Sequence, residues 1–457
     1  MDQTIPRKFD ATADDSTARL EALSGLSRRL LGLCRDAGAD QAEVSCSEES
    51  GLSVGVRMGE VETVEATRDR GIAVTVYFGN RKGSASTADL REESLAATVE
   101  QACAIARFTE ADPASGLADA ERMATGPLEL DTWHPWALDA DRAVELALAC
   151  EAAGRDADSR IANSDGATVG TGASLGVYAN SHGFTGTSRD TVHSISCALI
   201  AGHGEDMQRQ GWYSVGLSGA DLEPAAAVGR KAAARAVARL EPRPLATGQY
   251  PVLFDAQVAR TLIGHLVAAV SGGAQYRRAS FLLGSVGERL FPEWFHVHEQ
   301  PHLVRGLRSA WFDAEGVATR DSALVEAGTL QRYVLGSYSA RRLGLETTGN
   351  AGGVRNLRVA ASAGGQDELL RGMGSGLLVT DLMGQGVNTV TGDYSRGASG
   401  FWVENGAIAY PVEGITIAGN LRSMFQAIEA VGNDVDPRSH LRTGSILIGS
   451  MTVAGSQ

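Results

Sequence analysis

The segment His296–His302, HVHEQPH, contains the string H-E-x-x-H between His298 and His302. In zinc peptidases this string places two histidines on one face of a helix, with the glutamate beside the metal. Here Pro301 opposes a helix, because its ring clashes with the carbonyl four residues earlier. In a strand the two histidines would be about 13 Å apart, too far to share a zinc ion whose ligand nitrogens lie about 2.0–2.1 Å away. We therefore predict an extended strand, although an H-x-H metal site at His296 and His298 stays open.

Two glycine-rich strings also have the form of reactive sites. GASLG, Gly172–Gly176, matches the nucleophile elbow G-x-S-x-G with Ser174 as nucleophile. The elbow requires a buried strand before the serine, and the preceding NSDGATVGT lacks a strand pattern, so we expect no catalytic serine. Gly372, Gly374 and Gly376 precede a predicted strand, whereas a phosphate-binding loop follows a strand and opens a helix. We expect a turn there.

Other residue types that support catalysis have structural explanations as well. His265 lies at the edge of an apolar helix stripe, where a single histidine is usually a core residue rather than a ligand. Asp313 and Glu315, in WFDAEG, have the chemistry for acid–base work, and they also fit a turn between strands. The residues themselves leave both interpretations of this pair open.

Charge and composition exclude several classes of protein. The 457-residue chain has a net charge of −14 and no basic run, so nucleic-acid binding is not expected. Its cysteines, Cys34, Cys46, Cys103, Cys150 and Cys197, form no C-x-x-C pair and indicate free thiols in a reducing cytoplasm. We see neither a signal peptide nor a long uninterrupted apolar stretch, so we expect a cytoplasmic protein without a membrane span.

Residues 1–125 have the pattern of a helix, antiparallel strands and a second helix. Apolar spacing predicts a helix over about residues 16–37 and strands near 54–58 and 72–78. The string Asp89-Leu90-Arg91-Glu92 resembles a capping box, which predicts that a helix opens there and continues to about Phe108. We expect an N-terminal α+β domain over these residues.

A similar order of elements follows over residues 126–241, which we expect to form a central α+β domain. DADRAVELALACEAAG predicts an amphipathic helix, and PAAAVGRKAAARAVARL predicts the closing helix. Between them, three strands are predicted from LGVYANSHG, GTSRDTVHSISCALIAG and MQRQGWYSVGLS. Pro242 and Pro244 end the closing helix and mark the clearest domain boundary.

Residues 248–457 are dominated by strand patterns and glycine turns. A strand at Tyr250–Phe254 leads to a helix whose buried stripe is Val258, Leu262, Leu266 and Val270. Strands are then predicted from GLRSAWFDAEG, ATRDSALVEAGTLQRYVLG, SGLLVTDLMGQG and GFWVENGAIAYPVEGITIAG, with EAG and ENG as hairpin turns. We expect a glycine-rich antiparallel β domain, barrel-like, with one packed helix. The whole chain is therefore predicted to be α+β.

The C-terminal half carries four blocks whose order and spacing are specific. They are FDAEG (312–316), ARRLGLETTGNAGG (340–353), GDYSRGASGFWVENGAIAYPVEGITIAGNL (392–421) and VGNDV (431–435). Together they resemble the TldD/PmbA family. The helix–strand–helix N-terminal half is similar to that family's N-terminal region, so the resemblance covers nearly the whole chain.

The resemblance implies a cytosolic metallopeptidase made of two related subunits, each with an α+β N-terminal part and a β-rich C-terminal domain. The TldD-type subunit holds zinc with H-E-x-x-x-H on a helix and a later cysteine. Its partner, TldE or PmbA, lacks that site. The family's complex trims unfolded peptides, including peptide-antibiotic precursors, and takes part in the turnover of a labile antitoxin. An older name for PmbA is modulator of DNA gyrase.

Within that family the chain resembles the PmbA (TldE) branch. If YRRAS, Tyr276–Ser280, is matched to the segment after the family's zinc helix, the H-E-x-x-x-H positions fall on residues 264–269. Gly264 and Ala269 then replace the two histidines, and His265 stands at the glutamate position. No cysteine follows Cys197. We therefore expect no catalytic residue and no metal ligand in this chain, and zinc in its partner.

The resemblance thus predicts a non-catalytic subunit that pairs with a TldD-like catalytic subunit and binds unfolded or extended peptide. A homodimer is possible when the partner is absent. Asp393, Ser395 and Arg396, in DYSRGASG, are the expected contacts to peptide or partner. One alternative is a self-sufficient metallopeptidase that uses His296, His298 and Glu299 of HVHEQPH. A second is a regulatory binding protein of the gyrase-modulator type, which acts without proteolysis.

Overall fold

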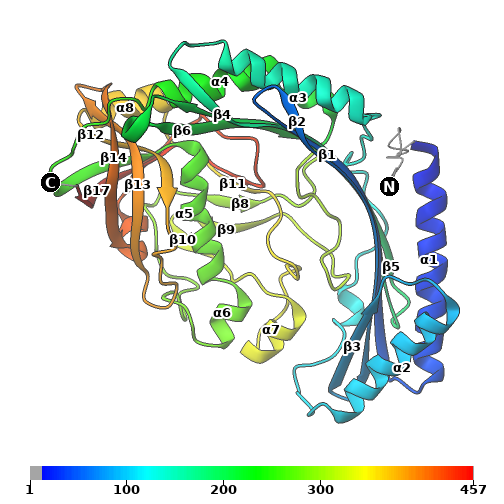
Figure 1. The fold of residues 1–457 in the computed structure, drawn as a ribbon. Helices are drawn as coiled ribbons and strands as arrows, with labels where there is room; N and C mark the ends of the chain where they lie inside the picture. The colour runs from blue at the N-terminus through cyan, green and yellow to red at the C-terminus, as the bar shows by residue number, and fades with distance from the viewer. Residues whose placement is uncertain (1–12, 456–457) are drawn as a thin grey trace. The chain divides into compact units, whose positions relative to one another are not determined.

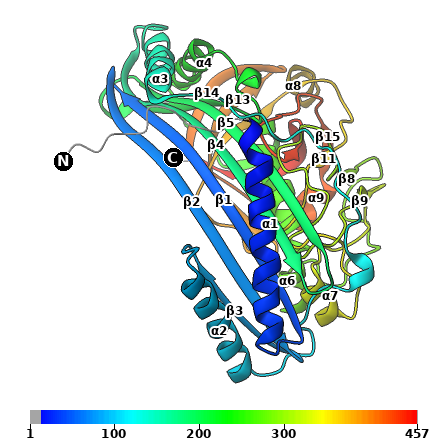
Figure 2. The ribbon, with the colours of Figure 1, turned by 90° about the vertical axis from the view of Figure 1, so that its right-hand side faces the viewer.

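The computed structural model describes residues 13–455, drawn as a ribbon in Figures 1 and 2. It divides into two compact units. Unit 1 comprises Met1–Val237 and Ala310–Thr319, and unit 2 comprises Ala238–Ser309 and Arg320–Gln457. Within residues 13–455, no helix has the length and apolar character needed to cross a membrane.

Unit 1 is built on one antiparallel sheet of six strands in the order β3-β2-β1-β4-β5-β6. Residues before and after position 126 contribute three consecutive strands each, and β1 and β4 join the two halves (Figure 2). The strands are β1 (Gln41–Arg57), β2 (Glu60–Phe78), β3 (Arg81–Thr87), β4 (Ile161–Asn180), β5 (Thr185–Ala201) and β6 (Gln208–Gly216). The helices are α1 (Ala13–Asp36), α2 (Glu92–Phe108), α3 (Ala140–Arg155) and α4 (Ala225–Val237).

Alternation along the strands explains why the helices cover one face of this sheet. Val44 and Val74 point into a core formed with α1 and α2, and Val169 and Leu199 point into a core formed with α3 and α4. Because successive residues of a strand point to opposite faces, the other face is lined by the intervening residues. Many of these are small, as Ser45 and its register partner Ala73 illustrate.

A buried carboxylate holds the tip of the long β1–β2 hairpin. Glu151, on α3, is 1% exposed, and its two oxygens accept hydrogen bonds from the backbone N–H groups of Met58 and Gly59, both at 2.8 Å. Both turn residues have positive φ, 53° and 82°. The hairpin is thus anchored at its tip although most of its outer strand is exposed.

Two local expectations for unit 1 were wrong. Helix α2 begins at Glu92 with Arg91 as N-cap, so no capping box forms; Asp89 instead accepts from the Arg91 N–H (2.9 Å) and the Ser94 hydroxyl (2.7 Å). Strand β4 begins at Ile161 and includes NSDGATVGT, which was predicted to lie outside a strand. Glycines such as Gly170 and Gly172 hid its pattern, because they add no apolar alternation.

Unit 2 contains a barrel-like sheet in the order β14-β13-β12-β7-β17-β15, and an additional β14–β17 pairing closes five of these strands into a ring. The strands are β7 (Gly248–Phe254), β12 (Gly376–Met383), β13 (Asp393–Glu404), β14 (Ala407–Asn420), β15 (Ile428–Val431) and β17 (Ile446–Ala454). Helix α5 (Ala256–Ala269) shares one hydrophobic core with them. The predicted α+β class and barrel-like C-terminal part are confirmed.

A second sheet of unit 2 has the order β10-β9-β8-β11-β16. Its strands are β8 (Val297–Glu299), β9 (Ser322–Glu326), β10 (Thr329–Leu330), β11 (Leu357–Val359) and β16 (Leu441–Arg442). Unit 2 is not purely antiparallel, because β12 pairs parallel with β7 and β11 with β16. The single expected helix is α5, and the described residues of unit 2 form four more: α6 (Gly272–Tyr276), α7 (Ser337–Leu343), α8 (Gln366–Met373) and α9 (Leu421–Gln426).

The two predicted hairpin turns of unit 2 are confirmed. Asn405 and Gly406 connect β13 to β14, and Ala327 and Gly328 connect β9 to β10, all with positive φ. Two consecutive positive φ angles are typical of the turns that suit the twist of a two-residue hairpin. The strand predicted over residues 306–316 does not form; this stretch consists mainly of turns and bends.

Candidate functional site

Helix α5 contains residues 264–269, onto which the family resemblance places the positions of the zinc-binding motif. Its N-terminus is capped by Asp255, whose side chain accepts from the Gln257 N–H at 2.9 Å. The predicted stripe is buried, with Leu262 and Leu266 exposed by 1% and 0%. The apolar stripe therefore determines which residues of α5 face the core, and the other residues of the helix are the ones that could bind a ligand.

The two positions expected for zinc-binding histidines carry no donor side chain. Gly264 has none, and a Cβ atom built there would meet only Leu441 Cδ1, at 3.9 Å. Ala269 is fully buried, and its carbonyl accepts hydrogen bonds from Gln275 Nε2 and Ser280 Oγ, both at 2.7 Å. Ser280 belongs to YRRAS, the segment that was matched to the family, and this segment is therefore hydrogen-bonded to the C-terminal end of α5.

These residues do not fit a zinc ion. A catalytic zinc site needs three protein ligands and an open position, and this part of α5 supplies one imidazole, His265. The charged group beside it is the Arg396 guanidinium, which would repel the metal. Among residues 13–455, no group of three or more histidine, cysteine, aspartate or glutamate side chains is arranged to hold a metal.

His265 instead belongs to a group of buried polar atoms that lack hydrogen-bond partners. The group, called here the α5–β13 cluster, is His265 Nε2, Tyr394 OH and Arg396 Nε, none of which has a partner among the described residues. The His265 and Tyr394 rings lie edge to face with centroids 6.0 Å apart. Tyr394 is only 1% exposed, and Arg396 lies two residues further along β13, on the same face.

The electrostatics of the α5–β13 cluster favour an oxygen ligand. Burial, and then the Arg396 charge, lower the pKa of His265, so its imidazole is neutral at pH 7. Burial raises the pKa of Tyr394 against the opposite influence of Arg396, so its phenol keeps its proton. The cluster thus offers phenol and guanidinium donors together with a neutral imidazole, a set suited to a carbonyl or carboxylate oxygen.

Strand alternation separates the three contact residues predicted on β13. Asp393 and Ser395 are exposed, whereas Tyr394 is buried and Arg396 half-buried on the opposite face. The Asp393 carboxylate accepts from Thr391 Oγ1 at 2.6 Å, and the Ser395 N–H donates to the Gly386 carbonyl at 2.7 Å. The structure therefore brings Arg396 to His265 rather than to Asp393 and Ser395. Tyr394 was missed, although its spacing from Arg396 is the signal that would have found it.

HVHEQPH does not form a helix: Val297–Glu299 form strand β8, whereas Pro301 and His302 lie in a turn, so the predicted strand is shorter than expected. His298 is exposed, while Glu299, on the opposite face of β8, is 2% exposed. Glu299 pairs with Arg332 and also accepts from Asn350 Nδ2 (2.9 Å) and the Arg355 backbone N–H. Its carboxylate is thus committed to an internal network and does not lie beside His298, as a zinc-peptidase glutamate would.

The remaining candidate strings form ordinary structure. Ser174 lies in the middle of β4, not at a strand-to-helix turn, so no nucleophile elbow forms. Of the three clustered glycines, Gly372 lies in α8 and Gly376 begins β12, and Gly374 between them has φ +70°, which confirms a turn. Asp313 Oδ1 accepts from the N–H groups of Glu315 (2.9 Å) and Val317 (3.0 Å), so this carboxylate organises a turn.

The second feature with functional chemistry is the outer edge of β2 in unit 1. Strand β3 pairs only with Ile72–Phe78, and among the described strands none pairs with the same edge over residues 60–71. Nearly all side chains of residues 60–70 are exposed on both faces. The Arg70–Glu48 ion pair (3.0 Å) holds one end of this segment, and Glu151 holds the hairpin tip at the other. The edge is thus preformed and open.

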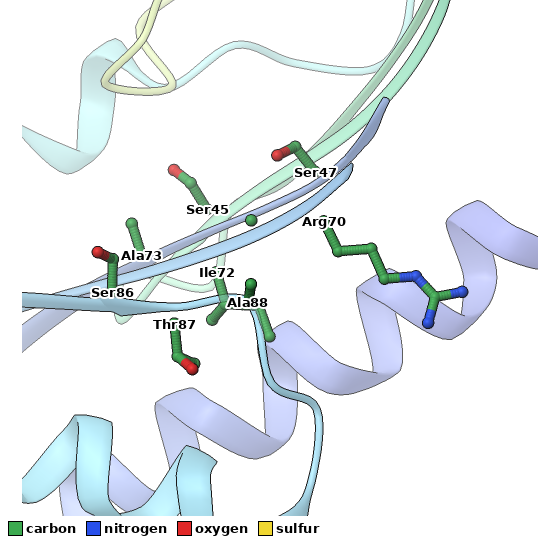
Figure 3. A pocket seen from close by; sticks show the side chains of 9 residues that line it. Ser45, Ser47, Arg70, Ile72, Ala73, Ser86, Thr87 and Ala88 are labelled. Atoms are coloured by element: carbon green, nitrogen blue, oxygen red, sulfur yellow. The ribbon is translucent and has the colours of Figure 1, made fainter. Parts of the chain in front are cut away.

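A hollow of about 470 Å³ lies where β3 ends and the open edge begins. Figure 3 shows Ser45, Ser47, Ala73 and Ser86 on one side of the sheet and Ile72 and Thr87 on the other. The hollow therefore wraps around the edge of the sheet rather than entering a core. Its lining side chains are mostly small and neutral, so the backbone of β2 can be approached closely here.

Comparison with known protein families gives three matches along the chain. Residues 42–106, 133–240 and 247–455 match domain 1, the central domain and the C-terminal domain of the PmbA/TldA metallopeptidases. Metalloprotease PmbA of Escherichia coli O157:H7 is 47% identical over 417 residues, 91% of this chain and 93% of that protein.

Solved structures show the same fold. A Bacteroides thetaiotaomicron protein described as a modulator of DNA gyrase superposes with a TM-score of 0.91 at 27% identity, covering 95% of this chain and 99% of that one. TldE from Thermococcus kodakarensis, at 20% identity, has a TM-score of 0.82 over 95% of this chain and all of that chain. This second likeness concerns the fold alone.

The three matched domains and the shared fold define the class of the protein, that of the PmbA/TldA-type metallopeptidases. By its sequence, the chain belongs to the PmbA/TldA metallopeptidase family.

Proposed function

We propose that this chain is the non-catalytic subunit of a cytoplasmic zinc metallopeptidase and binds unfolded peptide for a TldD-like catalytic partner. The observation that carries the proposal is the donor set of α5, where Gly264 and Ala269 stand at the expected histidine positions. An active site then has to come from another subunit. Peptide-antibiotic precursors and labile antitoxins are the substrates that the family resemblance suggests.

The open β2 edge supports binding of peptide in extended form. A peptide that adds as a strand gains main-chain hydrogen bonds that do not depend on its sequence, which suits unfolded substrates. The exposed charges of this segment, among them Glu62, Glu65 and Arg68, discourage uncontrolled pairing between copies of the chain. A peptide on this edge would continue the line of β3, across the hollow in Figure 3.

Co-expression with a TldD-like protein that carries H-E-x-x-x-H tests the partnership. We expect the two chains to co-purify and to migrate as one complex at micromolar concentration. Each chain should be examined alone as the control, where this one is expected to migrate as a monomer or homodimer. Separate migration of the two chains would contradict the proposal, and peptide cleavage by this chain alone would contradict its non-catalytic role.

Hydrogen exchange tests the β2 edge independently of the partner. An unstructured peptide should protect alternate backbone amides of Glu60–Gly71, because only every second N–H group of an edge strand points away from its neighbour. Copies of the peptide that are N-methylated on alternate residues provide the matched control. One methylation pattern should abolish protection and the other should leave it. If the peptide protects backbone amides only outside unit 1, the β2 edge is not the peptide-binding site.

A further inference from the structure

The second sheet of unit 2, β10-β9-β8-β11-β16, carries a row of basic side chains on the face opposite the hydrophobic core. In the register of the sheet, Arg358 on β11 lies opposite His298 on β8 and beside Arg442 on β16. The alternate residues, such as Val297 and Leu357, are fully buried on the other face. Residues His298, Arg358 and Arg442, called here the basic row, come from strands far apart in the sequence and are brought together only by the fold.

No carboxylate balances the two arginines of the basic row. Within residues 13–455, Arg358 and Arg442 form no ion pair, and Arg442 Nε is buried without a hydrogen-bond partner. Burial, and then the charge of Arg358, lower the pKa of Arg442. Like charges on directly opposed residues of neighbouring strands destabilise a sheet, so this pair costs free energy in the unliganded protein.

The segment that leads into β16 adds more positive charge. The pKa of His440 is lowered by burial and then by the nearby Arg308, Arg355 and Arg260. Asp436 offsets part of this charge through its contact with Arg260, at 3.9 Å, and its pairing with Arg438. The chain as a whole, in contrast, has a net charge of −14. An anion placed between Arg358 and Arg442 would relieve their repulsion and supply the missing partner of Arg442.

We propose that Arg358 and Arg442, with His298 beside them, bind a carboxylate group of the peptide substrate. Arginine suits this ligand because its planar fork donates two parallel hydrogen bonds to a carboxylate. The identification of the ligand as a peptide rests on the proposed function, whereas the preference for an anion rests on the basic row alone. The same arrangement opposes a metal at His298, because a divalent cation there would lie next to Arg358.

Calorimetric titration of the full chain with three acetylated hexapeptides tests the site. The first ends in a free carboxylate, the second in an amide, and the third in an amide with one central glutamate. We expect a carboxylate-bearing peptide to bind at least about tenfold more tightly than the neutral amide, since hydrogen bonds to charged groups are the stronger ones. Preference for the first peptide identifies a terminal carboxylate, and preference for the third identifies an acidic side chain.

Variants then assign the effect to the basic row. Arg358→Gln and Arg442→Gln should each weaken carboxylate binding about tenfold and leave the neutral amide unchanged. Arg358→Lys, which keeps the charge and loses the fork, should give an intermediate affinity. Arg371→Gln, at an exposed arginine on α8, is the matched control and should change nothing. Arg358→Gln should also raise the melting temperature of the unliganded chain, because it removes the repulsion.

Three outcomes would overturn the inference. The first is equal affinity for the acid and the amide, or no binding of any peptide at millimolar concentration. The second is an Arg358→Gln variant that behaves like the Arg371→Gln control. The third is a single-stranded oligonucleotide that binds more tightly than the peptides and loses its affinity in Arg442→Gln, which would identify phosphate as the ligand. Co-purification with the TldD-like subunit is scored separately, so failure of the proposed function can be distinguished from failure of this site.

Discussion

Two histidines of unit 2 lie in opposite surroundings and share one kind of neighbour. His265, on α5, has a buried ring nitrogen and lies against Tyr394 in the protein interior. His298, on β8, is exposed on the outer face of a sheet. Yet His265 has the guanidinium of Arg396 nearby, and His298 lies opposite Arg358. Both environments therefore suit an oxygen ligand better than a metal cation, and the charge of the neighbours is more informative than the string H-E-x-x-H.

The largest expected effect comes from the glutamate of that string. Glu299→Ala would leave Arg332 buried without its carboxylate and remove the acceptor for Asn350. Removal of one partner of a buried ion pair typically costs about 3–5 kcal/mol, so we expect a loss of unfolding free energy of that size in urea. His298→Ala, one residue away and exposed, should change it by less than about 0.5 kcal/mol. Equal effects of the two substitutions would remove the contrast between the two faces of β8.

A smaller effect, of opposite sign, is expected in the α5–β13 cluster. Tyr394→Phe deletes a buried hydroxyl that lacks a partner, and an unsatisfied group of this kind costs about 1–3 kcal/mol. We therefore expect the variant to gain about 1 kcal/mol of stability in chemical denaturation. Destabilisation instead would show that a buried water or another group satisfies this hydroxyl, and the cluster would no longer be a set of open donors.

The smallest expected effect is a dependence of stability on pH. Burial and Arg396 lower the pKa of His265 below its usual 6.5, so below that pH the unfolded chain binds a proton that the folded chain does not. The free energy of unfolding should therefore fall as the pH drops from 7 through 6.5, until the folded pKa is passed. His265→Asn should show a shallower fall in unfolding experiments at pH 7 and 5.5. The pH dependence of stability that remains in this variant would come in part from His193 and His440, whose pKa values burial also lowers. If the substitution leaves the change of unfolding free energy with pH unaltered, the pKa of His265 is not lowered by burial and this prediction is wrong.

Local patterns were sufficient to predict the elements that carry these histidines. The stripe of α5, the effect of Pro301 on β8 and the turn at Asn405-Gly406 all depend on residues a few positions apart, and all are confirmed. The first half of β4 was missed because its glycines lack side chains that could alternate. The parallel pairs β7–β12 and β11–β16 were missed because they join distant segments.

The functional groups were harder to predict than the elements. Arg396 was singled out, but together with Asp393 and Ser395, whose side chains lie on the other face of β13. Strand alternation alone would have paired Arg396 with Tyr394. In contrast, the contact of Tyr394 with His265 and the adjacency of Arg358 to Arg442 depend on tertiary packing and on a parallel register. No local pattern of a single sequence reports either.

The pairing of β17 has a consequence for how unit 2 folds. This last strand, Ile446–Ala454, pairs with β7 at the start of the unit and also with β14, and so completes the ring of strands. During synthesis β7 and α5 therefore keep apolar surface uncovered until β17 has left the ribosome. Contacts between such distant segments slow folding. A chain cut short before β17 would expose the edges of β7 and β14 and become a target for aggregation or for the cell's own proteases.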